Sequence, residues 1–169
     1  MFRVVSADVT SLFNPSVIAS LGAALGVAGG VAGSSIGIGK AASAGLSVVS
    51  EDPGTFKQVL ILSSLPMTQT FYGLIFALLN LTSILPGIAE MTWAKAGAFL
   101  GVGLFVMFAE LFSAWYQGVI CMSGIVELPR AGGRMLVPSM ILAAYVEMLG
   151  ILGMVLGYLL LLIVSGSPI

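Results

Sequence analysis

The stretch PSVIASLGAALGVAGGVAGSSIGIG, residues 15–39, contains no charged side chain. An α-helix of about 20 apolar residues is enough to cross the hydrocarbon core of a bilayer. Residues 58–89 form a second uncharged stretch that also exceeds this length. The two stretches together predict a protein whose helices lie in a membrane.

Two further apolar runs complete the pattern, and each is interrupted by one acid. Residues 96–126 contain only Glu110, and residues 135–169 contain only Glu147. The chain has 169 residues, of which 59% are hydrophobic and 8% are charged, whereas soluble domains are about 25% charged. We therefore expect an all-α membrane protein with four transmembrane helices. Their expected ranges are about 15–49, 56–85, 92–126 and 134–165.

The composition argues against several classes of function. The net charge is −1 and no basic cluster is present, so nucleic acid is not an expected partner. The chain has no histidine and a single cysteine, Cys121, so zinc, haem and iron–sulfur sites are not expected. We interpret Cys121 as a small apolar residue that fills space within a helix.

Basic residues in the connections predict the orientation of the chain. Lys40 and Lys57 flank the first connection, and Arg130 and Arg134 lie in the third. The second connection carries only Lys95, and the N-terminal segment carries a single arginine at position 3. Basic loops stay on the cytoplasmic side. We therefore expect cytoplasmic first and third connections, with both termini outside.

The layout resembles one helical hairpin written twice. In each half a long apolar run is followed by a short connection with a proline, Pro53 or Pro129, and by a second long run. The segment FYGLIFALL at 71–79 aligns with ILGMVLGYL at 151–159. Such self-similarity at a fixed spacing is the signature of an internal repeat.

The repeat predicts two tandem transmembrane hairpins, residues 1–87 and residues 88–169. In the same register Glu147 falls opposite Met67. Only the second hairpin therefore carries the carboxylate.

Glycines follow the first helix at intervals of four residues. The two series are Gly22, Gly26 and Gly30, and Gly29, Gly33 and Gly37. Small residues at this spacing let transmembrane backbones approach closely. Two series on one helix favour neighbours on two sides, as for a helix crowded in a ring of copies. The alternative is ordinary tight packing within one chain.

Polar side chains gather in the middle of the second helix, in LPMTQTFYG at 65–73. The residues that share one helical face are Leu65, Thr68, Gln69 and Tyr72. Pro66 has no N–H, so a backbone carbonyl one turn earlier loses its helical partner. This stripe offers oxygens in a setting where polar groups need partners. The alternative is a kinked helix whose polar groups bond to one another.

Glu147 lies within the last helix, where an acid costs about 2.5–3.5 kcal/mol on insertion. Gln117, in SAWYQGV, is a further amide in an apolar run. Glu147, Gln117, Gln69, Thr68 and one backbone carbonyl would together provide five oxygen donors and one negative charge. Oxygen ligands disfavour soft metals, and a divalent ion usually needs more carboxylates. The set therefore predicts a site for a small monovalent cation.

The stretches LPMTQTFYG at 65–73, YQG at 116–118 and AAYVEMLGILG at 143–153 resemble the proteolipid subunit of V-type and V/A-type ATPases. The resemblance covers almost the whole chain, in the duplicated four-helix form, and is greatest to bacterial sodium-translocating members. It implies a homo-oligomeric ring of copies in the lipid bilayer of a bacterial cell membrane. That ring would turn against a membrane stator subunit and connect to a central-stalk subunit. ATP hydrolysis would take place elsewhere, so the chain itself is not expected to be an enzyme.

The same resemblance implies the roles of individual residues. The ion ligands would be the Leu65 carbonyl, Thr68, Gln69, Gln117 and Glu147, and Tyr72 would hydrogen-bond the carboxylate and hold it closed. The ion would be Na⁺, with H⁺ as the alternative.

Two residues depart from what the resemblance predicts. Met67 stands where a small residue is expected, and Glu110 is an unexpected acid in the third helix. We interpret Glu110 as a protonated acid that is hydrogen-bonded between helices, with a stepping stone on the ion path as the alternative. A stand-alone secondary transporter or channel for a monovalent cation is the rival function, because a midplane acid and a repeat would also serve it.

Overall fold

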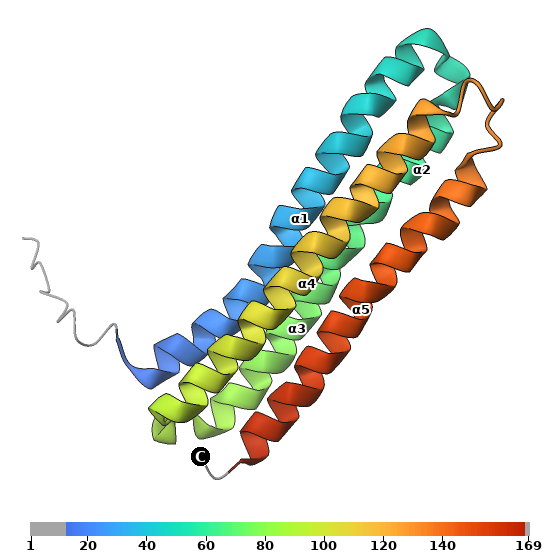
Figure 1. Cartoon of the computed structure of the whole chain (residues 1–169). Helices are drawn as coiled ribbons and strands as arrows, with labels where there is room; N and C mark the ends of the chain where they lie inside the picture. Colours follow the sequence, from blue (N-terminus) through green and yellow to red (C-terminus); the bar gives the residue numbers. More distant parts are fainter. Residues whose placement is uncertain (1–12, 168–169) are drawn as a thin grey trace, which may run out of the picture.

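The computed structural model of the chain describes residues 13–167. Four long helical rods lie side by side (Figure 1). The first rod is α1, Pro15–Glu51; the third is α4, Trp93–Val126; and the fourth is α5, Leu136–Gly166. The second rod consists of α2, Phe56–Ser64, a 3₁₀ turn η3, Leu65–Met67, and α3, Thr68–Ile84. Each of the four rods is long and apolar enough to cross a membrane.

The predicted helix boundaries agree closely with the observed ones, with one difference in the second rod. Its α-helix is interrupted by the 3₁₀ turn η3 at Leu65–Met67, where Pro66 cannot donate to the preceding turn. The rod continues as α3 in nearly the same direction (Figure 1).

Two connections lie at one end of the bundle and one at the other. The first connection contains the short helix η2, Pro53–Thr55, and the third contains Gly132 and Gly133 with φ of 54° and 79°. Positive φ favours glycine, because it has no Cβ to clash with the backbone. The second connection, η4 at Leu85–Glu90, lies at the opposite end. The first and third connections thus share one end, as the predicted orientation requires, whereas Arg3 lies outside the described residues.

Helix α1 packs most extensively against α4, and it does so through glycines. The glycines of α1 that lie against α4 are Gly22, Gly29, Gly33 and Gly37, and those that lie against α3 are Gly26 and Gly30. From the α4 side, Gly103 and Gly118 approach the backbone of Gly22 and Gly37. Side chains at these positions would push the helices apart.

The glycine contacts correct one expectation. The two series do face neighbours on two sides, but both neighbours are helices of the same chain. Packing within one chain therefore accounts for them, and they do not indicate contacts between copies.

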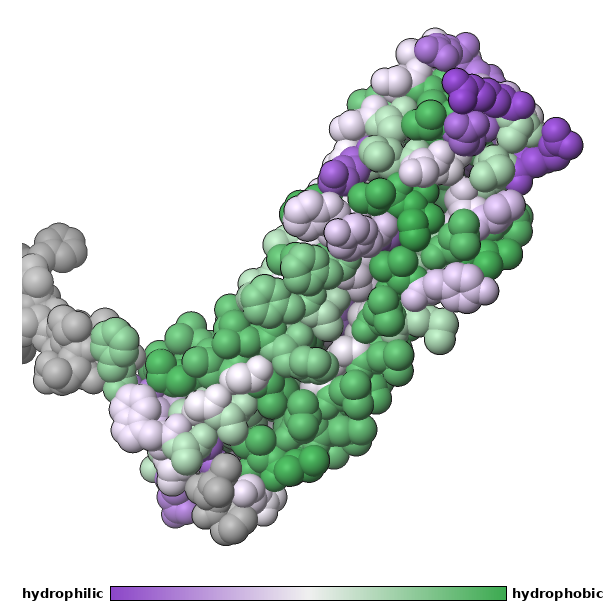
Figure 2. Space-filling model, viewed as in Figure 1, coloured by the Kyte–Doolittle hydropathy of each residue, from purple (hydrophilic) through white to green (hydrophobic). Residues whose placement is uncertain are grey.

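Large apolar side chains are exposed along all four rods, including Phe71 on α3, Phe108 on α4 and Leu149 on α5. In Figure 2 apolar residues cover most of the visible face, and hydrophilic residues gather mainly at the end that carries the first and third connections. Cys121, in contrast, is buried within an apolar cluster, as its interpretation as a filler residue predicts.

Candidate functional site

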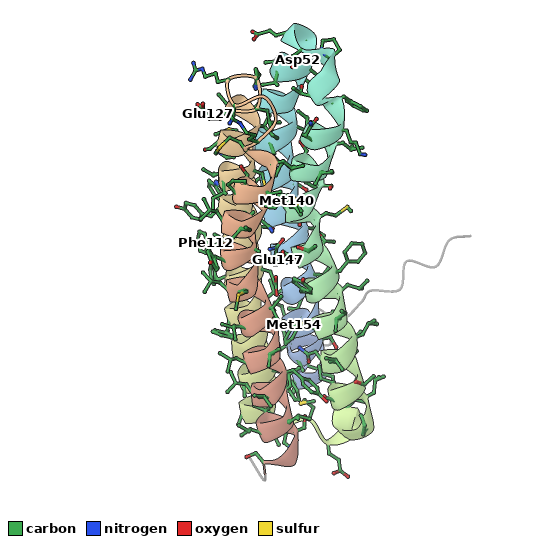
Figure 3. All side chains as sticks on the ribbon, turned by 90° about the vertical axis from the view of Figure 1, so that its right-hand side faces the viewer. Asp52, Phe112, Glu127, Met140, Glu147 and Met154 are labelled. Atoms are coloured by element: carbon green, nitrogen blue, oxygen red, sulfur yellow. The ribbon has the colours of Figure 1, made fainter. Side chains whose placement is uncertain are left out.

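Glu147 lies near the middle of the bundle, on α5 between Met140 and Met154 (Figure 3). Its side chain is half-buried. The Tyr72 hydroxyl on α3 lies 3.0 Å from Oε1, and the Gln117 side chain on α4 donates from Nε2 to Oε2 over 3.3 Å. Three helices therefore meet at this one carboxyl group.

A second layer of polar side chains continues from Gln117 towards α3. Gln69 is fully buried, and its Nε2 donates to Gln117 Oε1 over 3.0 Å. The Thr68 hydroxyl lies 3.2 Å from Gln69 Oε1 and 3.2 Å from the Leu65 carbonyl oxygen. The predicted set of Leu65, Thr68, Gln69, Tyr72, Gln117 and Glu147 thus forms one continuous hydrogen-bonded cluster, which we call the Glu147 cluster.

The local sequence explains how α3 presents its part of this cluster. Pro66 is buried against Gly37 of α1. Because proline cannot donate to the preceding turn, the chain tightens into η3, and the Leu65 carbonyl accepts from the Thr68 N–H. After the turn, Gln69 reaches Ser113 and Gln117 of α4, and Thr68 bonds to Gln69 within its own helix. Met67 lies on the outer side of the turn and is 45% exposed.

Ser113 also belongs to the Glu147 cluster, and the sequence reasoning missed it. Its hydroxyl accepts from Gln69 Nε2 over 3.0 Å and donates to the Val146 carbonyl over 2.8 Å. Ser113 precedes Gln117 by one helical turn, so it shares the same face of α4. That spacing indicates a shared helical face. Serine is common in transmembrane helices, however, so Ser113 was not predicted as a site residue.

Glu110 is separate from these contacts. It is 0% exposed, and neither carboxyl oxygen has a hydrogen-bond partner among the described residues. The predicted hydrogen bond between helices is therefore absent. The carboxyl group instead lies over the bare backbone of Gly150 on α5.

The Glu147 cluster has no cationic partner within the part of the chain that the structure describes. The one ion pair found there joins Arg130 and Glu127, 3.3 Å apart and exposed. Lys40 lies over the Trp115 ring, 5.8 Å from its centroid. Nor do three His, Cys, Asp or Glu side chains of residues 13–167 meet as a metal site would require. Within residues 13–167, the side chains that contact the Glu147 carboxyl are the neutral ones of Tyr72 and Gln117.

Comparison with known proteins matches both halves of the chain to one family. The model of the family of the ATP synthase C subunit matches residues 21–80 and again residues 100–160. The repeat inferred from the sequence layout is thereby confirmed as two hairpins of the same kind.

Two curated relatives are similar to the chain over most of its length. The A-type ATP synthase subunit K of Methanocaldococcus jannaschii is 39% identical over 135 residues, which are 78% of this chain and 58% of that protein. The V-type sodium ATPase subunit K of Enterococcus hirae is 36% identical over 132 residues, 76% of this chain and 80% of that protein. The chain thus spans little more than half of the archaeal relative and most of the bacterial one.

Proposed function

This chain belongs to the family of the ATP synthase C subunit, as a duplicated, non-catalytic proteolipid of the V/A type, and on that premise we propose that it carries Na⁺ across a membrane. Glu147 would hold the ion together with Thr68, Gln69, Gln117 and the Leu65 carbonyl. The observation that carries this proposal is a chain of hydrogen bonds that leads from Leu65, Thr68 and Gln69 through Gln117 to one carboxyl group, which has no cationic partner among the described residues.

The hydrogen bonds of the Glu147 cluster support a site that can exchange its contents. Gln117 now directs Nε2 at Glu147 and Oε1 at Gln69. A half-turn of this amide would direct Oε1 at a cation beside the carboxylate. The Tyr72 hydroxyl, 3.0 Å from Oε1, would then hold the carboxylate in place. Because the bound cation neutralises Glu147, the loaded site could pass through lipid without the cost of a bare charge.

One contact favours H⁺ as the second candidate. A proton on Glu147 Oε1 would find an acceptor in the Tyr72 hydroxyl. Under that alternative, however, Thr68, Gln69 and Ser113 would serve only as partners for one another. Buried polar groups are costly to provide, and a proton needs fewer of them than Na⁺ does. This surplus is our reason for preferring Na⁺.

The relatives' names and the surface support assembly into a ring of copies. The E. hirae relative is a subunit of a V-type sodium ATPase. In this chain α4 and α5 border an open apolar groove of about 790 Å³, lined by Phe105, Phe108, Phe112 and Leu149 among others. Such a surface needs lipid or another protein helix as its neighbour. A stator subunit and a central stalk would be the remaining partners.

Within the ring, residues 88–169 would supply the carboxylate and residues 1–87 most of the neutral oxygens. The first and third connections would face the cytoplasm. A mass measurement in mild detergent separates this assembly from a stand-alone transporter, because a ring is many times heavier than one chain.

Carbodiimide labelling tests the choice of ion, since the reagent attacks a protonated carboxyl group. If Na⁺ occupies the site, millimolar Na⁺ should slow the labelling of Glu147, and K⁺ at the same ionic strength should not. Gln117→Leu removes one ligand and should weaken the protection by about 10- to 100-fold, as loss of supporting ligands commonly does. Labelling that follows pH but ignores Na⁺ would mean that the chain carries protons.

A further inference from the structure

The most unusual group outside the Glu147 cluster is the carboxyl of Glu110. An ideal Cβ placed on Gly150 would lie 2.9 Å from Glu110 Oε2 and 2.9 Å from Ser113 Oγ. The two oxygens are therefore separated by less than twice that distance. The Glu110 carboxyl occupies the space that a side chain at position 150 would need. It lies next to the Glu147 cluster without bonding to it.

The helices around Glu110 offer it no positive charge. On the α1 side the neighbouring stretch of α4 meets glycines, with Gly29 against Met107 and Gly33 against Leu111. On α3 the titratable neighbour is Tyr72, which interacts electrostatically with both Glu110 and Glu147. On α5 the titratable side chains are Tyr145, Glu147 and Tyr158. An ionised Glu110 would thus have no counter-ion within the described residues.

A buried carboxylate without a partner is far more costly than a buried neutral acid. Glu110 must then hold either a proton or a second metal cation. A second Na⁺ would need several oxygens around it, and the oxygen that accompanies Glu110 Oε2 in the space beside Gly150 is Ser113 Oγ. That hydroxyl already donates to the Val146 carbonyl and accepts from Gln69. A proton needs no such set of ligands.

We propose that Glu110 is a second proton-binding site of the chain, which stays loaded with a proton while Glu147 exchanges its ion. While Glu110 holds its proton, Glu147 is the acid that gives this region its negative charge. This consequence rests on the proposed function. A site with a single negative charge favours a monovalent cation, because a divalent cation usually binds more carboxylates. Glu110 is thereby not a step on the ion path.

Infrared spectroscopy of the full chain in detergent tests the proton directly. In the Glu147→Gln chain at neutral pH, we expect one carbonyl band of a protonated carboxylic acid, unchanged by Na⁺ and absent from Glu147→Gln/Glu110→Gln. Comparison of these two variants isolates Glu110, because they differ at that residue alone. The wild-type chain saturated with Na⁺ should show the same band, and this sample tests the proposal without any substitution. Absence of the band from both samples would overturn the proposal.

Counting bound ²²Na⁺ separates a proton from a second cation. We expect one Na⁺ per wild-type chain, and none per Glu147→Gln chain. Two Na⁺ per wild-type chain, falling to one in Glu110→Gln, would show that Glu110 binds Na⁺ and would overturn the proposal. If no Na⁺ binds to the wild type while the protonated band persists, Glu110 holds its proton and the proposed transport of Na⁺ fails.

Discussion

The second rod of the first hairpin (α2, η3 and α3) and the second rod of the second hairpin (α5) are built differently. In the first hairpin the rod is broken by η3 at Leu65–Met67, and its polar groups are neutral. In the second hairpin α5 is unbroken from Leu136 to Gly166 and carries Glu147. Under the proposed function, this difference means that the two copies of one hairpin divide the site between them. One copy supplies oxygens from a tight turn, and the other supplies the charge.

The first helices of the two hairpins differ as well. Through the region that faces the Glu147 cluster, α1 presents glycines, which allow α3 and α4 to approach it closely. Helix α4 presents Ser113 and Gln117 there, and both side chains are buried. The glycine helix sets the distance between backbones, and the polar helix fills the space between α3 and α5 with hydrogen-bonding groups. Four predictions test this division of roles, in order of decreasing expected effect.

Removing the charge should abolish transport altogether. Glu147→Gln keeps the size of the side chain but cannot balance a cation, so Na⁺ uptake by the assembled ATPase should fall to background while the subunit still assembles. The matched control is Glu127→Gln, which disrupts an exposed pair with Arg130 that contributes about 0–1 kcal/mol at most. Wild-type-like uptake in Glu147→Gln would remove the carboxylate from the mechanism.

Moving the charge to the first hairpin should not restore transport. Met67 aligns with Glu147 in the repeat, but it lies on the outer side of η3 and is 45% exposed. The groups that contact Glu147, Tyr72 and Gln117, are directed at α5. Glu147→Gln/Met67→Glu should therefore remain inactive in the same uptake assay. Recovered uptake would mean that the two hairpins are interchangeable and would contradict the division of roles.

Crowding the contact between α1 and α4 should reduce stability. A Cβ on Gly103 would meet the backbone of Gly22, so Gly103→Ala should destabilise the chain by about 1–3 kcal/mol, the usual cost of overpacking. Gly101→Ala is the matched control, because nothing lies within 4 Å of that position. The control should be neutral or slightly stabilising, since alanine favours a helix over glycine. Unfolding of the two variants in detergent provides the comparison, and equal stabilities would show that this contact is not tight.

The smallest effect is expected for a substitution of Glu110 in α4. Glu110→Gln keeps the shape and the neutral charge of a protonated carboxyl, so uptake of Na⁺ should decrease only slightly. Measured beside Glu147→Gln, it asks whether Glu110 and Glu147, the acids within α4 and α5, have the same role. A loss as large as that of Glu147→Gln would put Glu110 on the ion path.

Much of the fold could be predicted because its causes are local. A helix satisfies its backbone hydrogen bonds within one segment, and a bilayer requires that of every spanning segment. Long uncharged runs therefore marked the rods, and the missing N–H of Pro66 marked the point where the second rod is interrupted. The spacing of Leu65, Thr68, Gln69 and Tyr72 placed them on one face for the same reason, since helical period depends on one segment alone.

What the tertiary structure decided is how these faces meet. The sequence by itself determined four apolar helices, a repeat, and which residues could share a face. Only the packed bundle decided that the glycines of α1 face α3 and α4, that Ser113 joins Gln69 to the backbone of α5, and that Glu110 lies over Gly150 without a partner among the described residues. Each of these depends on the relative rotation and depth of two helices. The relative rotation and depth of two helices are set by many side-chain contacts between them. The periodicity of residues within one helix carries no information about those contacts.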